Sequence, residues 1–191
     1  DKIADIISNI TKKNLKPLII DCGANIGCSG MYFKKLVDNS AVINIEPDDN
    51  NFLLLSENCR SADFENIKSA VSSKEIFFEV INTHDDNRAY KIKRIEVGNK
   101  KTVTIEKIIK YKKSNLKPFL IKFDIEGFEK DVFSENTNWI QEFKVIIIEI
   151  HDWMLPGENC SENLLKVISK MKKDLILSGE NLIIINNNYK L

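Results

Sequence analysis

The stretch that decides the fold is Leu18-Ile19-Ile20-Asp21-Cys22-Gly23-Ala24-Asn25-Ile26-Gly27. An apolar run ends at Asp21, and Gly23 and Gly27 then bracket a short loop. Between Met31 and Val37 the apolar residues recur at helical spacing. This order predicts a buried strand, a glycine loop and a helix, whose N-terminal N–H groups face whatever binds at the loop.

The spacing of the loop separates two classes of nucleotide ligand. A dinucleotide fold uses G-x-G-x-x-G so that a pyrophosphate touches the backbone, whereas three residues separate Gly23 from Gly27 here. Asp21, at the end of the strand, suits a cationic or amine group, such as the amino-acid end of S-adenosylmethionine. We expect both glycines to let that ligand approach the backbone. The alternative is that the loop is only a tight turn between strand and helix.

A second acidic residue, Glu46, closes the apolar run 42–45 about 20 residues after the loop. A carboxylate at this place in a nucleotide-binding fold accepts hydrogen bonds from ribose hydroxyls. A solvated loop residue is the alternative for Glu46 alone. Together with Asp21 in one β-α-β unit, however, Glu46 indicates a site for an adenosyl ligand.

The composition is that of a globular domain with a sizeable core. The chain has 191 residues, of which 43% are hydrophobic and 29% are charged. The net charge of +0 gives no long-range attraction to nucleic acid or to anionic membranes. No apolar run approaches the ~20 residues of a membrane span. We therefore expect a small-molecule or glycan partner, no nucleic acid and no integral membrane segment.

The four cysteines show no C-x-x-C pairing, and Cys22 and Cys59 lie among apolar residues. This usage favours a reducing compartment, and we expect a cytoplasmic protein. No signal peptide is visible. The sequence begins at Asp1 without Met, which is compatible with a segment of a longer protein.

The rest of the chain alternates between helical and strand patterns. Residues 1–13 predict an amphipathic helix, and we expect residues 1–16 either to pack on the sheet or to cover the ligand. Residues 75–105 are β-rich and predict an inserted pair of antiparallel hairpins, with the polar tip 83–88 as a candidate substrate lid. The predicted helices are 28–38, 48–60, 104–112, a helix starting at 125, and 161–172. The predicted strands are 18–22, 41–46, 66–72, 119–124, 144–150, 174–178 and 181–186.

Four motifs together resemble the FkbM family of class I S-adenosylmethionine-dependent methyltransferases. They are Asp21–Gly27, Glu46-Pro47, Lys122-Phe123-Asp124-Ile125-Glu126-Gly127-Phe128-Glu129 and Ile147-Ile148-Glu149-Ile150-His151. The resemblance covers about residues 16–185. It implies one α/β domain over residues 1–191, with a Rossmann-like, doubly wound, mostly parallel seven-stranded sheet and an antiparallel last strand. It also implies an O-methyltransferase that acts on a hydroxyl of a sugar, a glycan or a secondary metabolite.

The resemblance assigns roles to individual residues. The loop residues would line the methionine and ribose end of the cofactor, Glu46 would bind the ribose, and Asp48 would lie near the adenine with the 70–72 turn. Asp124 would face the sulfonium and the acceptor. Phe128 stands where the family commonly has a small residue, which alters the shape of the pocket. The expected cofactor-binding residues are Asp21, Gly23, Ala24, Asn25, Gly27, Glu46, Pro47, Asp48, Ala70, Val71 and Asp124.

Methyl transfer to a hydroxyl also needs a group that removes the proton, and the candidate catalytic residues are Asp124, Glu126 and His151. The unperturbed pKa of a histidine, ~6.5, suits this role. Two neighbouring carboxylates would instead raise the pKa of one of them. Two structural alternatives stay open, in which His151 only hydrogen-bonds a loop and Asp124 only orients the cofactor.

A divalent metal ion is a further option for the acidic strand ends, because carboxylates and a histidine are metal ligands. The residues that could take part are Asp124, Glu126, Glu149, His151 and Asp152. A metal-free sulfonium site needs the same carboxylates, so we favour no metal and assign no ligand.

Two other functions fit parts of the pattern. The first is a non-catalytic module that binds a nucleotide or S-adenosylmethionine on the same fold. The second is an NAD-type oxidoreductase, and the missing G-x-G-x-x-G counts against it.

Overall fold

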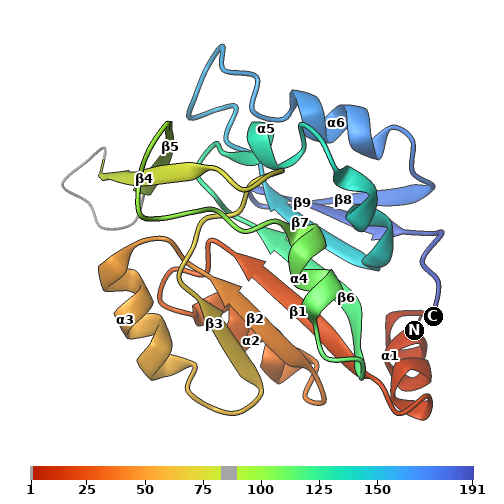
Figure 1. Ribbon diagram of the computed structural model, residues 1–191. Coiled ribbons are helices and arrows are strands. Elements are labelled where there is room, and N and C mark those ends of the chain that lie inside the picture. The colour runs from red at the N-terminus through yellow and green to blue at the C-terminus, as the bar shows by residue number, and fades with distance from the viewer. Residues whose placement is uncertain (1, 83–89) are drawn as a thin grey trace.

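The computed structural model describes residues 2–82 and 90–191 and contains a seven-stranded sheet in the order β3-β2-β1-β6-β7-β9-β8 (Figure 1). Neighbours among the first five strands are parallel, and β9 runs antiparallel to both β7 and β8. The predicted sheet, with its antiparallel last strand, is confirmed. The strands are β1 (Lys16–Cys22), β2 (Ala41–Ile45), β3 (Phe64–Ile67), β6 (Leu116–Phe123), β7 (Val145–Glu149), β8 (Lys173–Ser178) and β9 (Asn181–Asn186).

Helices cover both faces of this sheet. On one face lie α1 (Lys2–Lys12), α2 (Cys28–Leu36) and α3 (Asp49–Asn58). On the other lie α4 (Ile105–Tyr111), α5 (Glu129–Val132), the 3₁₀ helix η1 (Thr137–Glu142) and α6 (Glu162–Ile168). The central strands are apolar throughout because both faces are covered. In β1, for example, Leu18 and Ile20 pack toward α4 and α6, and Ile19 packs toward α1.

The amino-terminal helix packs on the sheet, which is the first of the two expected arrangements. Ile10 of α1 is fully buried in a cluster that also contains Ile19 and Val42. Figure 1 shows α1 near the amino end of β1, away from the carboxyl ends of the strands.

Among the described residues, no helix has the length and apolarity needed to cross a membrane.

The inserted β-rich segment forms a separate antiparallel hairpin of β4 (Phe77–Asn82) and β5 (Tyr90–Ile95). The hairpin lies beyond the carboxyl ends of β1 and β2 (Figure 1). The predicted lid at its tip, residues 83–88, lies outside the described residues. A second strand pair was expected at 101–105, but this segment forms two isolated bridges instead, an antiparallel one between Lys101 and Phe77 and a parallel one between Val103 and Val71.

Two further element boundaries differ from the sequence prediction. The third strand ends at Ile67, earlier than the predicted 66–72, because the Ser69 backbone N–H turns back to the Ile67 carbonyl. The helix expected from residue 125 begins only at Glu129. Glu126 and Gly127 have φ values of 55° and 92°, which a right-handed helix does not accommodate.

At Gly23 the chain just after β1 passes close to the end of β6. The φ of Gly23 is +79°, and a Cβ built on it would lie 1.8 Å from the Asp124 carbonyl oxygen. The sequence prediction that Gly23 makes room for a ligand therefore misses its main constraint, which is the neighbouring backbone. Gly27 is constrained similarly, because a Cβ there would lie 2.6 Å from the Cys59 sulfur.

This constraint predicts that Gly23→Ala strongly lowers the free energy of unfolding measured with urea. The matched control is Gly157→Ala, because Gly157 also has a positive φ but nothing lies within 4 Å of its added Cβ. The control should lose about 1–2 kcal/mol from the left-handed backbone alone. Gly23→Ala should lose at least about 2 kcal/mol more, since the added carbon meets a backbone atom. Equal losses in the two variants would contradict the packing argument.

Candidate active site

A hollow lies at the carboxyl ends of β1, β2 and β6. These strands are adjacent and parallel, so the residues that follow them meet at one edge of the sheet. Ile92 of β5 contributes a wall from the hairpin. The lining residues are Gly23, Asn25, Ile45, Glu46, Pro47, Asn51, Ser69, Ala70, Val71, Ile92, Asp124, Ile125, Glu126 and Phe128.

Glu46 organises the glycine loop on one side of the hollow. Its Oε2 accepts a hydrogen bond from the Asn25 backbone N–H at 2.9 Å, and its Oε1 accepts one from the Asp48 backbone N–H at 2.8 Å. Burial raises the pKa of Glu46 to about 7, although both of these hydrogen bonds favour the ionised form. Each carboxylate oxygen retains a lone pair, so Glu46 can still accept hydrogen bonds from a ligand in the hollow.

A buried lysine joins the acidic ends of β1 and β6. Lys122 Nζ lies 2.9 Å from Asp124 Oδ2 and 3.9 Å from Asp21 Oδ1. The geometry follows from the strands, because Lys122 pairs with Asp21 across the sheet and points to the same side as Asp124. The three groups therefore form one charge cluster beneath the hollow.

Asp21 is the least satisfied member of this cluster. It is fully buried, and neither carboxylate oxygen has a hydrogen-bond partner among the described residues. The Gly30 backbone N–H lies close to it and favours the anion, but outside hydrogen-bonding geometry. Burial raises the pKa of Asp21 to about 6, against the opposing effect of the Lys122 charge. Buried carboxylates normally accept hydrogen bonds, so an exception such as Asp21 needs an explanation. A bound ligand that donates a hydrogen bond to Asp21 would provide one.

His151 and Glu129 form a second buried polar pair beside the hollow. His151 Nδ1 lies 2.8 Å from Glu129 Oε1, and both side chains are about 2% exposed. Burial lowers the pKa of His151, but the hydrogen bond to Glu129 and the nearby charges of Glu126 and Glu149 outweigh it and raise the pKa. The opposite ring atom, Nε2, lies 3.9 Å from Asp124 Oδ1.

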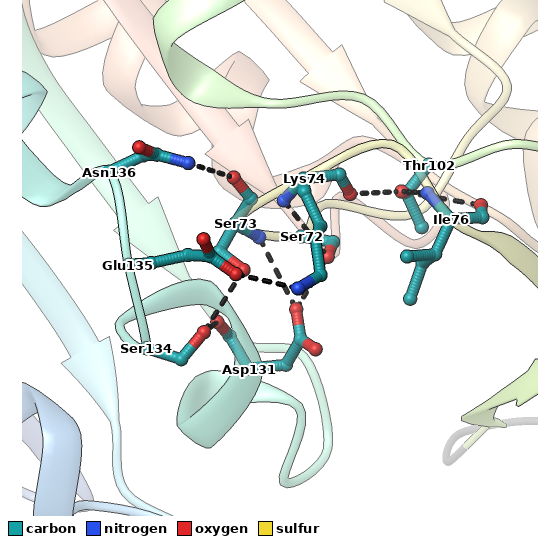
Figure 2. A network of polar contacts seen from close by, with 9 residues as sticks. All are labelled: Ser72, Ser73, Lys74, Ile76, Thr102, Asp131, Ser134, Glu135 and Asn136. Atoms are coloured by element: carbon teal, nitrogen blue, oxygen red, sulfur yellow. Dashed lines mark hydrogen bonds and ion pairs between the residues drawn. The ribbon is translucent and has the colours of Figure 1, made fainter.

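A polar network fixes the segment that follows the pocket wall Ala70-Val71 (Figure 2). Ser72 Oγ donates to Asp131 Oδ1 of α5, and Ser134 Oγ donates to Ser73 Oγ at 3.0 Å. Lys74 Nζ lies 2.7 Å from Glu135 Oε1. The network thereby holds the wall of the hollow in register with α5, which begins with Glu129.

The structure brings most of the predicted site residues together, but not all of them. Those that line the hollow are Gly23, Asn25, Glu46, Pro47, Ala70, Val71, Asp124 and Glu126. Asp21 and His151 are buried and are not among the lining residues. Ala24, Gly27 and Asp48 do not line it. Asp48 instead caps α3, where its Oδ1 accepts hydrogen bonds from the backbone N–H groups of Asn50 and Asn51.

The sequence analysis did not identify several residues that line the hollow, and it did not identify Glu129 as the partner of His151. Asn51 lies in the first turn of α3, and its distance of one helical turn from the cap Asp48 could have indicated it. Ser69 would have been found with the correct end of β3. No sequence pattern indicates that Ile92 lines the hollow, because its position depends on how the hairpin folds back over the sheet. Glu129 belongs to the quoted motif, but its partner His151 is 22 residues away.

Comparison with known families now places the chain. A family model described as "Methyltransferase FkbM domain" matches residues 21–175, which include the glycine loop, Glu46, Asp124 and His151. The chain belongs to the FkbM methyltransferase family. The predicted family is therefore confirmed, and this membership disfavours the NAD-type oxidoreductase. No curated protein sequence matches this FkbM chain.

Solved structures with the same fold are distant in sequence from the FkbM chain. A chain of the fibrillarin/Nop5p complex is 15% identical with a TM-score of 0.51, covering 93% of this chain and 74% of that one. The METTL16 MTase domain is 12% identical with a TM-score of 0.51, covering 99% and 67%. M. capricolum TrmK, in complex with S-adenosyl-homocysteine, is 9% identical with a TM-score of 0.50, covering 96% and 69%. At these identities the likeness shows the fold alone.

The raised pKa of Asp21 predicts how the stability of the FkbM chain depends on pH. The folded state binds this proton more tightly than the unfolded chain, so the free energy of unfolding should fall as pH rises from about 4 through about 6. We expect a loss on the order of 3 kcal/mol from Asp21. Urea unfolding at a series of pH values measures it.

Asp21→Asn should reduce this pH-dependent loss, because the titrating carboxyl is removed. Asp38→Asn changes an exposed carboxylate and should leave the slope of stability against pH as in the parent chain. The comparison concerns the slope and not the absolute stability, so a general loss of stability in Asp21→Asn does not obscure it. An unchanged slope in Asp21→Asn would show that Asp21 is ionised in the folded state at low pH.

Proposed function

We propose that the chain transfers a methyl group from S-adenosylmethionine to a hydroxyl oxygen of a sugar, glycan or secondary metabolite. The observation that carries the proposal is that Glu46 and Asp124, which end neighbouring strands, line one hollow with the glycine loop. Family membership supports methyl transfer, and the S-adenosyl-homocysteine in the similarly folded TrmK supports the cofactor.

The residues around the hollow fit the parts of this cofactor. The free lone pairs of Glu46 suit two ribose hydroxyls, and Pro47, Ala70 and Val71 offer apolar surface to a purine. The amino-acid end would lie toward the 23–27 loop and Asp21, whose carboxylate oxygens have no hydrogen-bond donor in the part of the chain that the structure describes. When bound, S-adenosylmethionine supplies the methyl group on a sulfonium. Asp124, at the end of β6, would help to position the reacting groups and would form no covalent bond with them.

The acceptor would enter through a second hollow that adjoins the first. Ile92, Glu126 and Phe128 line both hollows, and Leu155 belongs to the second. The acceptor hydroxyl would thus reach the sulfonium between Asp124 and Glu126. The proton of that hydroxyl would go to a carboxylate oxygen of these two residues or to His151 Nε2, which faces both.

Charge and surface chemistry support a neutral, hydroxyl-bearing acceptor. The carboxylates of Asp124, Glu126 and Glu149 gather at this edge, and they would repel a phosphodiester and accept hydrogen bonds from hydroxyls. Trp153 is 64% exposed just after His151 and offers a flat face on which a sugar ring can pack.

The four cysteines are all unpaired, which supports a cytoplasmic location.

The cofactor assignment predicts that Glu46→Gln weakens S-adenosylmethionine binding about 10–100-fold in calorimetry, because charged hydrogen bonds to the ribose are lost. Glu65→Gln, an exposed residue of β3, is the matched control and should bind as the parent chain does. Unchanged affinity in Glu46→Gln, with binding by the parent chain, would remove Glu46 from the site.

The reaction itself is tested with S-adenosylmethionine labelled in its methyl group. We expect label in an oxygen-linked methyl group when the protein is incubated with a panel of neutral sugars and oligosaccharides, followed by fractionated cell extract. Label in RNA or protein would contradict the proposed acceptor class. Cofactor binding without any transfer would favour the non-catalytic module.

A further inference from the structure

The imidazole of His151 is held so that one ring nitrogen faces a group of carboxylates. Nδ1 is engaged by Glu129 Oε1 at 2.8 Å, which fixes the ring orientation. Nε2 points the other way, 3.7 Å from both Glu126 Oε2 and Glu149 Oε1, and 3.9 Å from Asp124 Oδ1. His151 is buried, and the hydrogen bond that the described residues make with its ring is the one between Nδ1 and Glu129. A buried, oriented nitrogen is therefore aimed at a cluster that could contain a ligand.

The spacing of the donor atoms suits a single cation. One donor atom each from Asp124, Glu126 and His151 lie within 4.8 Å of one another. Metal ligands about 2.1 Å from one ion stand about 3 Å apart in cis positions and about 4 Å apart in trans positions. The observed separations of 3.7 and 3.9 Å from Nε2 fall inside this range.

The three donors come from three segments of the chain, and a neighbouring carboxylate orients the histidine. Asp124 follows β6, Glu126 lies in the tight turn before α5, and His151 follows β7. The carboxylate of Glu129 on Nδ1 is the arrangement that orients metal-binding histidines in many proteins and makes them more basic. Lys122 engages only the Oδ2 oxygen of Asp124, and Oδ1 is the atom that faces His151.

We propose that Asp124, Glu126 and His151 bind one divalent cation, with Glu129 orienting the histidine. An imidazole with two carboxylates suits a first-row ion such as Mn²⁺ better than Ca²⁺ or Mg²⁺, which prefer oxygen donors alone. Three protein ligands leave coordination positions open for water or a substrate oxygen.

The structure narrows the five candidate ligands of the sequence to these three. Asp152 is engaged elsewhere, because its carboxylate accepts hydrogen bonds from the Ser161 backbone N–H at 3.2 and 3.4 Å. Glu149 lies beside the three donors and adds negative charge. The sequence favoured a metal-free site, and this proposal departs from that expectation.

The ion would stand at the wall shared by the two hollows, where Glu126 lines both. There it would polarise an acceptor hydroxyl. The proton would go to a carboxylate oxygen of Asp124 or Glu126 that does not hold the ion, because His151 Nε2 would hold it. This role rests on the proposed function, whereas binding of the ion does not.

The experiment titrates the full chain, freed of metal with a chelator, with Mn²⁺ and follows free Mn²⁺ by electron paramagnetic resonance. We expect saturable binding of one Mn²⁺ per chain. Glu126→Gln should weaken it at least about tenfold because a ligand is lost, and Glu129→Gln about tenfold because the histidine loses its orienting charge. Glu158→Gln alters an exposed carboxylate at the rim of the second hollow and should leave Mn²⁺ affinity within about twofold.

Absence of saturable Mn²⁺ binding by the parent chain would overturn the proposal. Weak binding that all three variants reduce equally would also overturn it, because it would reflect diffuse surface charge. S-adenosylmethionine binding, measured by calorimetry in the presence of the chelator, separates the two proposals. Cofactor binding without Mn²⁺ binding would leave the proposed methyl transfer standing and remove the metal site.

Discussion

The contact of Gly23 with the Asp124 carbonyl sets the geometry on which the site depends. It allows the ends of β1 and β6 to approach closely enough for Lys122 to reach both Asp21 and Asp124. Because β2 lies on the other side of β1, Glu46 enters the same hollow. A residue larger than glycine would push the two strand ends apart and separate the carboxylates from each other.

The site retains buried charge that folding alone does not explain. Asp21 lacks hydrogen-bond partners among the described residues, and the pKa values of Asp21 and Glu46 are raised to about 6 and about 7 by burial. Each shift means that the ionised carboxylate destabilises the ligand-free fold near neutral pH. Such groups are commonly kept where a ligand offers the missing hydrogen bonds or charge. The buried carboxylates thus lower the stability of the ligand-free fold, and they suit a nucleoside with a cationic centre.

The sequence was sufficient for those parts of the fold that depend on local pattern. The strands before Asp21, Glu46 and Asp124 are apolar runs, and parallel strands bring their ends to one edge, so these three could be placed together. The meaning of Gly23 could not be predicted, because it depends on a carbonyl about a hundred residues away. Likewise, Ile92 and the Glu129–His151 pair depend on long-range packing that no local period encodes. The late start of α5 reflects positive φ angles, which Glu126 adopts against its usual preference.

The central claim is that Glu46, Asp124 and the glycine loop above the buried Asp21 hold one adenosyl ligand along its length. A crystal structure of the protein with S-adenosylhomocysteine tests it most directly. The account predicts that both ribose hydroxyls lie within hydrogen-bonding distance of the Glu46 carboxylate, with the amino-acid end at the 23–27 loop and the sulfur toward Asp124. A nucleoside bound elsewhere on the molecule, or a ribose that makes no contact with Glu46, would contradict the account.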